Sequence, residues 1–304
     1  INNIDEIKLL KIKKNINLNQ ALFIVISKSG NTIETLSNFS FLKVIKKNKK
    51  NIIIISEKND NPLYQLSKKM NFFHIEYKNY IGGRYSVLTE VGMLPAYLMG
   101  LDILKFRKNL LVHLKSKNKN FLKESSIILT KLYKKRKIKN LIFFNYVPQL
   151  NKFLFWCQQL IAESLGKKGL GFLPVISTGP KDHHSLLQLY LDGPKDKIFY
   201  IFSSQMNNKI KIFPKVLGKN FNFLNNKSLS QIKNAQKNAF LYTLKKRGIP
   251  FREFKIKNLS EEVLGELFSY FILETAIIGK LANINPFNQP AVEQVKISTQ
   301  KILD

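Results

Sequence analysis

The sequence contains a single cysteine, Cys157, among its 304 residues. One cysteine cannot form an intramolecular disulfide, and it cannot supply a cluster of cysteine metal ligands. We therefore expect neither a disulfide framework nor a cysteine-based metal site, which suits a reducing cytoplasm. Beside Trp156, we expect Cys157 to be a small buried apolar side chain.

Long uncharged apolar runs are also missing. The most apolar helical stretch, near residues 263–281, is interrupted by Glu266, Glu274 and Lys280, and no basic-then-apolar secretory signal stands at the N-terminus. We therefore expect no membrane-spanning segment, no membrane partner and a cytoplasmic location. The chain starts with Ile1 and soon reaches a central-looking strand, so we expect an upstream portion.

Acidic residues are scarce, with 20 Asp and Glu against 50 Lys and Arg and a net charge of +30. Such a charge favours polyanionic partners and salt-sensitive adhesion to them. The excess is nearly all lysine and is scattered through Lys-Asn-Ile stretches such as 46–51, 115–120 and 131–139. No RNA-reading aromatic motif or basic recognition helix organises it. We attribute the excess to an AT-rich coding sequence and expect no specific nucleic-acid partner.

The glycine patterns of nucleotide-binding loops are absent, but another phosphate-binding pattern is present. An apolar strand at residues 23–26 enters the turn 27–32, which opens an amphipathic helix. Backbone N–H groups at a helix N-terminus favour an anion. The segment therefore predicts a site for a small phosphorylated ligand, bound by the hydroxyls of Ser27, Ser29, Thr32 and Thr35, and an ordinary turn capped by Ser and Thr is the alternative for this motif by itself.

Apolar strands alternate with helical segments along the whole chain. The predicted strands are 22–27, 52–56, 72–77, 140–146, 197–203 and 251–256. This order is typical of parallel, doubly wound sheets, so we predict an α/β fold with two lobes, each a three-layer αβα sandwich. We place the first lobe, incomplete at its N-terminus, at 1–110, the second at 111–285 and a C-terminal helix that completes the active site at 286–304.

Several helices can also be located. One helical stretch is predicted near residues 84–104, another ends near Gly166 or Gly169, and a long helix starts after Ser260 with two glutamates in its first turn. The segment 289–303 is expected to form the final helix.

Three further clusters carry chemistry. In Gly82-Gly83-Arg84, the glycines let the backbone approach a ligand and Arg84 offers a fixed positive charge, although a turn with a solvated arginine is the alternative. Glu163 has apolar neighbours and is a candidate base, with an ordinary surface glutamate as its alternative. The adjacent His183 and His184 make a poor metal site, so we expect one to be a general acid or base.

Together these segments closely resemble the glucose-6-phosphate isomerase (phosphoglucose isomerase) family in its shorter bacterial form. The resemblance extends over nearly the whole chain and rests on segments in the family's order: 27–35, 82–86, 163–167, 184–188 and 289–296. It implies sugar isomerase (SIS-type) lobes and the interconversion of glucose 6-phosphate and fructose 6-phosphate through a cis-enediolate, in glycolysis and gluconeogenesis.

The resemblance also implies a role for each site residue. Ser27, Ser29, Thr32 and Thr35 would hold the phosphate, with backbone help around Lys28. Glu163 would be the base, and Arg84 would stabilise the enediolate. His184 and Lys296 would serve ring opening, and Gln289 would contact the substrate.

The family also implies a homodimer in which Glu34 orients a histidine, His184, that comes from the neighbouring subunit. No metal and no redox cofactor are needed. The chain departs from the animal enzymes after Glu163, where it has Ser-Leu-Gly instead of Ser-Asn-Gly.

Three alternatives remain from the sequence. A sugar-phosphate sensor of the same fold needs the phosphate loop but not Glu163, Arg84, His184 and Lys296 together. An isomerase of another sugar phosphate is harder to separate, since specificity depends on pocket shape. A polyanion-binding protein would be driven by the net charge alone.

Overall fold

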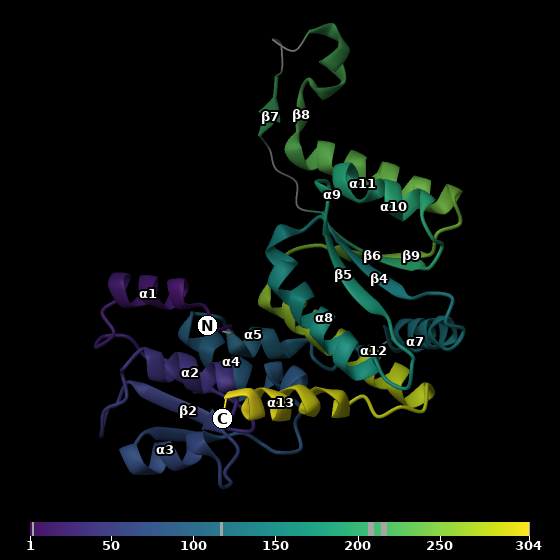
Figure 1. Ribbon diagram of the computed structural model, residues 1–304. Coiled ribbons are helices and arrows are strands. Elements are labelled where there is room, and N and C mark those ends of the chain that lie inside the picture. The colour runs from purple at the N-terminus through teal and green to yellow at the C-terminus, as the bar shows by residue number, and fades with distance from the viewer. Residues whose placement is uncertain (2, 116–117, 206–209, 214–217, 304) are drawn as a thin grey trace. The chain divides into compact units, whose positions relative to one another are not determined.

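The computed structural model of the chain describes residues 1, 3–115, 118–205, 210–213 and 218–303 (Figure 1). They form two compact units, Ile1–Ile103 and Leu104–Asp304, each built on a parallel β-sheet with helices packed around it. The α/β class predicted from the sequence is thus confirmed, whereas the domain limits at residues 110 and 285 stay predictions. Among the helices of the described ranges, none is both long and apolar enough to cross a membrane.

The first unit has a sheet in the order β1-β2-β3, with every pair parallel. Ile52 and Ile54 of the central strand are fully buried, because apolar residues of the flanking helices pack against them. In chain order the elements are α1 (Glu6–Asn15), β1 (Phe23–Ile26), α2 (Ile33–Phe41), β2 (Ile52–Ser56), α3 (Pro62–Met70), β3 (Phe73–Glu76), the 3-10 helix η1 (Gly83–Leu88) and α4 (Glu90–Leu98).

The three strands predicted for this unit are confirmed, but the single helical stretch at 84–104 is wrong. The structure has η1 and α4 there, and α5 (Ile103–Lys108) starts only after a break. Thr89 is extended, and its side chain accepts from Val91 N, so a new helix starts at Glu90. Gly100 has a φ of +89°, which stops the chain from continuing as a helix.

The second unit starts with three helices and continues as an alternation of strands and helices. In chain order it contains α5, α6 (Val112–Lys115), α7 (Asn118–Lys134), β4 (Asn140–Asn145), η2 (Pro148–Leu150), α8 (Asn151–Leu165), β5 (Leu173–Thr178), α9 (Asp182–Ser185), α10 (Leu187–Asp192), β6 (Lys197–Ser204), β7 (Lys211–Ile212), η4 (Lys219–Leu224), β8 (Lys227–Ser228), α11 (Leu229–Lys246), β9 (Phe251–Ile256), α12 (Glu261–Leu281), η5 (Pro290–Val292) and α13 (Glu293–Leu303).

The main sheet of this unit has the order β5-β4-β6-β9, with all pairs parallel, so the strand order reverses between β4 and β6. The sheet is therefore doubly wound, as predicted. Helices α10 and α11 cover one face and α7, α8 and α12 the other, which makes three layers (Figure 1). Ligands of such sheets bind at the carboxyl ends of the strands, near the reversal. The edge strand β5 was not predicted from the sequence.

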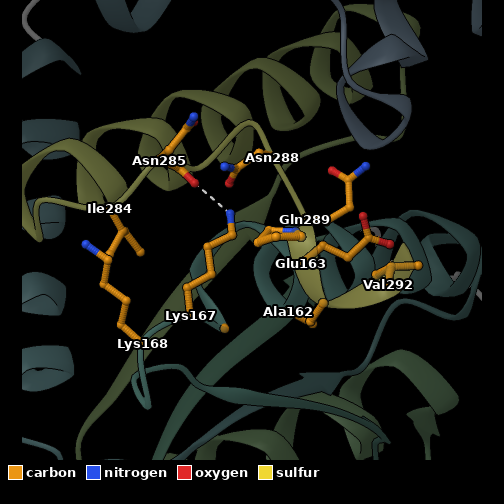
Figure 2. A pocket seen from close by; sticks show the side chains of 12 residues that line it. Ala162, Glu163, Lys167, Lys168, Ile284, Asn285, Asn288, Gln289 and Val292 are labelled. Atoms are coloured by element: carbon orange, nitrogen blue, oxygen red, sulfur yellow. Dashed lines mark hydrogen bonds between the residues drawn. The ribbon is translucent and has the colours of Figure 1, made fainter. Parts of the chain in front are cut away.

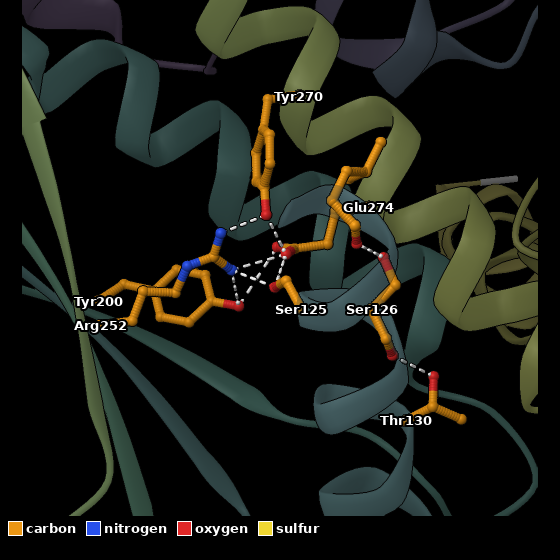
Figure 3. Close-up of polar contacts among 8 residues, drawn as sticks. Ser125, Ser126, Thr130, Tyr200, Arg252, Tyr270 and Glu274 are labelled. Atoms are coloured by element: carbon orange, nitrogen blue, oxygen red, sulfur yellow. Dashed lines mark hydrogen bonds and ion pairs between the residues drawn. The ribbon is translucent and has the colours of Figure 1, made fainter. Parts of the chain in front are cut away.

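A buried polar network fastens α12 to the sheet (Figure 3). Arg252 of β9 donates to Glu274 Oε1 of α12 at 2.7 Å, and Tyr270 also donates to this oxygen, at 2.6 Å. Ser125 of α7 reaches the same oxygen at 2.5 Å, and Tyr200 of β6 donates to Glu274 Oε2 at 3.2 Å. A buried ion pair of this kind depends on such additional hydrogen bonds. The network fixes the helix that leads into residues 282–292.

Candidate active site

The loop between β1 and α2 starts with a buried serine. Ser27 donates its backbone N–H to Ile55 O of β2 at 3.0 Å. Its Oγ lies 2.7 Å from Thr32 Oγ1 and accepts from Thr32 N at 3.4 Å. The two hydroxyls therefore hold the ends of the loop together. Thr32 directly precedes α2, so the loop lies at a helix N-terminus, where an anion is favoured.

Gly30 makes the turn of this loop. Its φ of +67° lies in the left-handed region, which favours glycine. A Cβ at this position would lie 1.7 Å from Oδ1 of Asn61, the residue that caps α3. Leu63 also donates its backbone N–H to Gly30 O at 3.2 Å. The loop after β1 is therefore fixed by its contact with the loop after β2.

Ser29, Glu34 and Thr35 complete the predicted residues near this helix start. Ser29 Oγ donates to Asn31 Oδ1 at 2.5 Å. Glu34 is exposed in the first turn of α2, and Thr35 is half-buried beside it. The structure thus places all four predicted hydroxyls on the turn or on the first helical turn.

The side chain of Lys28 is engaged with groups outside the loop. Its Nζ donates to Asn79 O at 2.7 Å and lies 3.8 Å from Glu57 Oε1. Its backbone carbonyl accepts from Glu57 N at 3.0 Å, which again ties the loop to the segment after β2. These contacts fit the expectation that this position assists a phosphate through its backbone.

Arg84 lies in η1 and is only 2% exposed, so the alternative of a solvated arginine at a turn is wrong. Its guanidinium carbon lies 5.2 Å from the centre of the Tyr85 ring. The preceding Gly83 has open space where a Cβ would stand. A buried guanidinium keeps its charge and its forked set of donors, which suits the binding of a negatively charged group.

In the second unit, Glu163 of α8 lines a cavity of about 640 Å³ (Figure 2). The opposite wall is the segment after α12, where Gln289 lines the same space. Glu163 is half-buried, and its Oε1 accepts from Gln159 Nε2 at 2.9 Å. Helix α8 ends at Leu165, as predicted. Two site residues predicted from distant segments thus share one cavity.

Lys167, the last residue of the sequence segment 163–167, is a second charged residue of this cavity, and no role was predicted for it. Its Nζ donates to Ser164 O at 3.0 Å and to Asn285 O at 2.6 Å, the bond drawn in Figure 2. Lys167 therefore joins the end of α8 to the opposite wall. Because Lys167 comes four residues after Glu163, the sequence predicts, though only weakly, that the two side chains lie on the same side of the chain. Asn288 also lines the cavity and was missed.

The two adjacent histidines have different surroundings, which the sequence could not tell apart. His183 is half-buried, and its Nε2 lies 2.6 Å from the Tyr146 hydroxyl. His184 is exposed on α9, the short helix after β5. Of the two, His184 is therefore the more accessible to solvent, as expected of a residue that exchanges protons with a substrate.

The last predicted site residue, Lys296, is exposed on α13. It lies about one helical turn after Val292, which lines the cavity with Gln289. The predicted final helix is confirmed, preceded by the 3-10 turn η5. Among the side chains that the structure describes, no three His, Cys, Asp or Glu are grouped as they would be to hold a metal ion.

Comparison with known protein families identifies one match over the whole chain. The model of the phosphoglucose isomerase family covers residues 1–304. A protein of Methanococcus maripaludis named "Probable glucose-6-phosphate isomerase" is 36% identical over 97% of this chain and 68% of its own length. One of Methanocaldococcus jannaschii named "Glucose-6-phosphate isomerase" is 34% identical over 97% of this chain and 75% of its own.

Solved structures agree with this match. A hypothetical protein of Thermus thermophilus superimposes with a TM-score of 0.87 at 26% identity, over 99% of this chain and 75% of that one. A glucose-6-phosphate isomerase of Chlamydia trachomatis superimposes with a TM-score of 0.78 at 21% identity. The superposition covers 99% of this chain and 62% of that protein. At this level of identity the similarity shows only a shared fold.

Proposed function

The chain belongs to the phosphoglucose isomerase family, and from this premise we propose that it interconverts glucose 6-phosphate and fructose 6-phosphate, a reaction of glycolysis and gluconeogenesis. The names of its relatives support this activity. The observation that carries the proposal is the shared cavity of Glu163 and Gln289, since a carboxylate and a substrate contact are needed side by side. We also propose a cytoplasmic location.

Aldose–ketose isomerisation moves one proton between two neighbouring carbons of the substrate. In our proposal Glu163 takes the proton from C2 of the aldose and returns it to C1, while the hydroxyl proton of O2 passes to O1. Both hydrogens are thus accounted for, and no external oxidant is used. The intermediate is a cis-enediolate with negative charge on oxygen, which the guanidinium of Arg84 stabilises. His184 and Lys296 open the sugar ring before this step.

The phosphate of the substrate binds, in this proposal, at the loop 27–35. The hydroxyls of Ser27, Ser29, Thr32 and Thr35 donate to it, and the backbone around Lys28 and the start of α2 add N–H donors. Gln289 contacts the sugar in the cavity. In this arrangement the loop binds the phosphate, and Glu163 carries out the proton transfer.

We further propose that two copies of the chain form a dimer. His184 would reach the active site of the partner copy, where Glu34 would hold its ring in the productive orientation. The exposure of both side chains supports this arrangement, because a residue that acts across an interface must stand on the surface of its own chain.

The experiment measures conversion of fructose 6-phosphate to glucose 6-phosphate by the full-length gene product and by Glu163→Gln. Removing a positioned base typically lowers turnover about 10²–10⁴-fold, so kcat should collapse while KM changes little. Glu124→Gln, an exposed substitution on α7, is the matched control and should retain wild-type kcat.

Three other results would change the proposal. Equal turnover by wild type and Glu163→Gln would remove Glu163 from the role of base. A folded wild-type protein that binds the sugar phosphate but does not convert it would favour the sensor. Rapid turnover of a different sugar phosphate would favour the other isomerase.

A further inference from the structure

The two residues that precede His184 in the short helix α9, Asp182 and His183, attach this helix to its surroundings. Asp182 Oδ2 accepts from Thr178 N at 2.7 Å, and Asp182 Oδ1 accepts from Ser185 Oγ at 2.9 Å. These bonds close the turn between β5 and α9. A four-residue helix has too few internal hydrogen bonds to be stable alone, so its orientation depends on such contacts.

His183 provides the second attachment, on the side of the protein core. Its ring packs against those of Phe144, at 5.6 Å, and Phe240, at 5.3 Å, measured between ring centres. Its Nε2 lies 2.6 Å from the hydroxyl of Tyr146, which is 1% exposed and follows β4 directly. Tyr146 thus lies where the strand order of the sheet reverses, beside the carboxyl ends of β4 and β6.

The direction of the Tyr146–His183 hydrogen bond follows from the burial of both groups. Burial lowers the pKa of His183, and neighbouring His184 lowers it further against the opposing effect of Asp182. Burial raises the pKa of Tyr146 well above its usual value. The histidine is therefore neutral and the tyrosine keeps its proton. Because the buried Tyr146 hydroxyl has no other acceptor among the described hydrogen bonds, we assign it as the donor to Nε2, which leaves the imidazole proton on Nδ1.

We propose that Tyr146 and His183 are positioning residues for His184: their hydrogen bond fixes α9 on the sheet and thereby holds the exposed ring of His184 in one direction. This inference rests on the proposed function, in which His184 serves ring opening. Because His183 and His184 are consecutive in a single helical turn, α9 cannot rotate without breaking the bond at Tyr146.

The first test compares Tyr146→Phe with Tyr190→Phe in the full-length protein. Both remove a buried hydroxyl from the same unit, since Tyr190 OH lies 2.6 Å from Ser177 Oγ, but Tyr190 makes no contact with His183 or His184 in the hydrogen bonds described. Misplacement of a catalytic group typically costs up to about 10²-fold. We expect kcat to fall about 10-fold or more in Tyr146→Phe with KM unchanged, and to stay at the wild-type value in Tyr190→Phe. Equal kcat losses in both variants, or no loss in either, would overturn the inference.

The second test separates the hydrogen bond from the packing of the ring. His183→Gln keeps an acceptor for Tyr146, whereas His183→Phe keeps a ring without one. We expect His183→Gln to retain most of the wild-type kcat and His183→Phe to have the same kcat as Tyr146→Phe. The double variant Tyr146→Phe/His183→Phe should show no further loss of kcat. A loss in His183→Gln as large as in His183→Phe would contradict the proposal.

A third measurement does not depend on activity. The chain has four histidines, so selective ¹⁵N labelling gives a simple spectrum of imidazole signals. We expect His183 as the Nδ1–H tautomer, and we expect Tyr146→Phe to shift or broaden the signals of His184 as well. Unchanged His184 signals would refute positioning even in a fully active enzyme, whereas an inactive wild type with the expected signals would refute only the isomerase. Wild-type kcat in His184→Ala would also refute the inference and leave the isomerase intact.

Discussion

The loop at residues 27–35 and the cavity beside α8 are assembled in opposite ways. In the loop, the polar groups are neighbours in the chain and bind one another, as Ser27 does with Thr32. In the cavity, Glu163 comes from a helix and Gln289 from a distant segment, and Lys167 joins the two walls through Asn285. The proposed binding function is thus encoded in consecutive residues, whereas the proposed chemical function depends on the fold of the whole unit.

This contrast predicts different kinetic effects. Substitutions in the loop should weaken binding of the phosphate and raise KM, because the phosphate itself does not react. Substitutions in the cavity should lower kcat, because in the proposed mechanism Glu163 acts on the reacting carbons.

Arg84 offers the strongest challenge to this division, since it belongs to the first unit but is proposed to stabilise the enediolate. Arg84→Lys keeps a positive charge but removes the forked donors. We expect kcat to fall about 10²-fold, the typical cost of losing one donor to a developing charge, with KM changed much less. Steady-state kinetics with fructose 6-phosphate measures both values.

The matched control for this substitution is Arg107→Lys, an exposed arginine on α5. It should leave both kinetic constants at the wild-type level. A higher KM with wild-type kcat in Arg84→Lys would instead place Arg84 with the phosphate-binding residues.

Thr32→Val should give the next largest effect and sharpen the contrast. Valine keeps the shape of threonine but loses the hydroxyl that pairs with Ser27 and is proposed to meet the phosphate. A hydrogen bond to a charged group contributes about 1.5–3 kcal/mol, so KM should rise about 10-fold or more while kcat stays near the wild-type value. Thr243→Val on α11 is the control, because it removes the hydroxyl of another threonine, half-buried and far along the chain, which donates to Ala239 O. A selective loss of kcat would argue against the proposed division.

The smallest expected effect is on stability at acidic pH, which should depend on an ion pair in the second unit. Burial alone would raise the pKa of Glu253, but hydrogen bonds from Lys237 and Ser203 outweigh it and hold the pKa below its ordinary value of 4.5. The ionised form is thus favoured by folding, so its stabilisation is complete above pH 4.5 and is lost as the pH falls through the folded-state pKa. The single tryptophan, Trp156, lies in this unit and reports its unfolding by fluorescence.

For this measurement we compare wild type with Glu253→Gln between pH 7 and pH 3. The variant should be less stable at pH 7, and its stability should depend less on pH in the acid range. Glu124→Gln should follow the wild-type curve. Parallel curves for Glu253→Gln and wild type would show that Glu253 is not responsible for the acid loss.

Much of the fold could be predicted from the sequence, because buried parallel strands are continuous apolar runs. The segment 52–56, Ile-Ile-Ile-Ile-Ser, matches β2 residue for residue, and 251–256 matches β9 although this edge strand contains Arg252, Glu253 and Lys255. The edge strand β5 was missed since its sequence, Leu-Pro-Val-Ile-Ser-Thr, contains a proline and leaves Leu173 64% exposed. The break between η1 and α4 was missed because Thr89 is compatible with a helix interior and with a cap alike.

The site was predictable only in part, for reasons that lie in its construction. The loop 27–35 is local, so its pattern could be recognised directly. The sharing of one cavity by Glu163 and Gln289 depends on where α12 directs the chain, which no local pattern encodes. The difference between His183 and His184 depends on Tyr146 and Phe240, two side chains from other elements. The roles of all these residues in catalysis stay predictions.

The contact between Gly30 and Asn61 limits how this protein can be altered by directed evolution. A library that varies position 30 alone should return only glycine, since any other side chain meets Asn61 and most also resist a positive φ. Asparagine tolerates that backbone conformation and should appear at position 30 only together with glycine at position 61, where it is still an acceptable helix cap. Position 30 can therefore change only together with position 61, so the loop after β1 and the loop after β2 constrain each other.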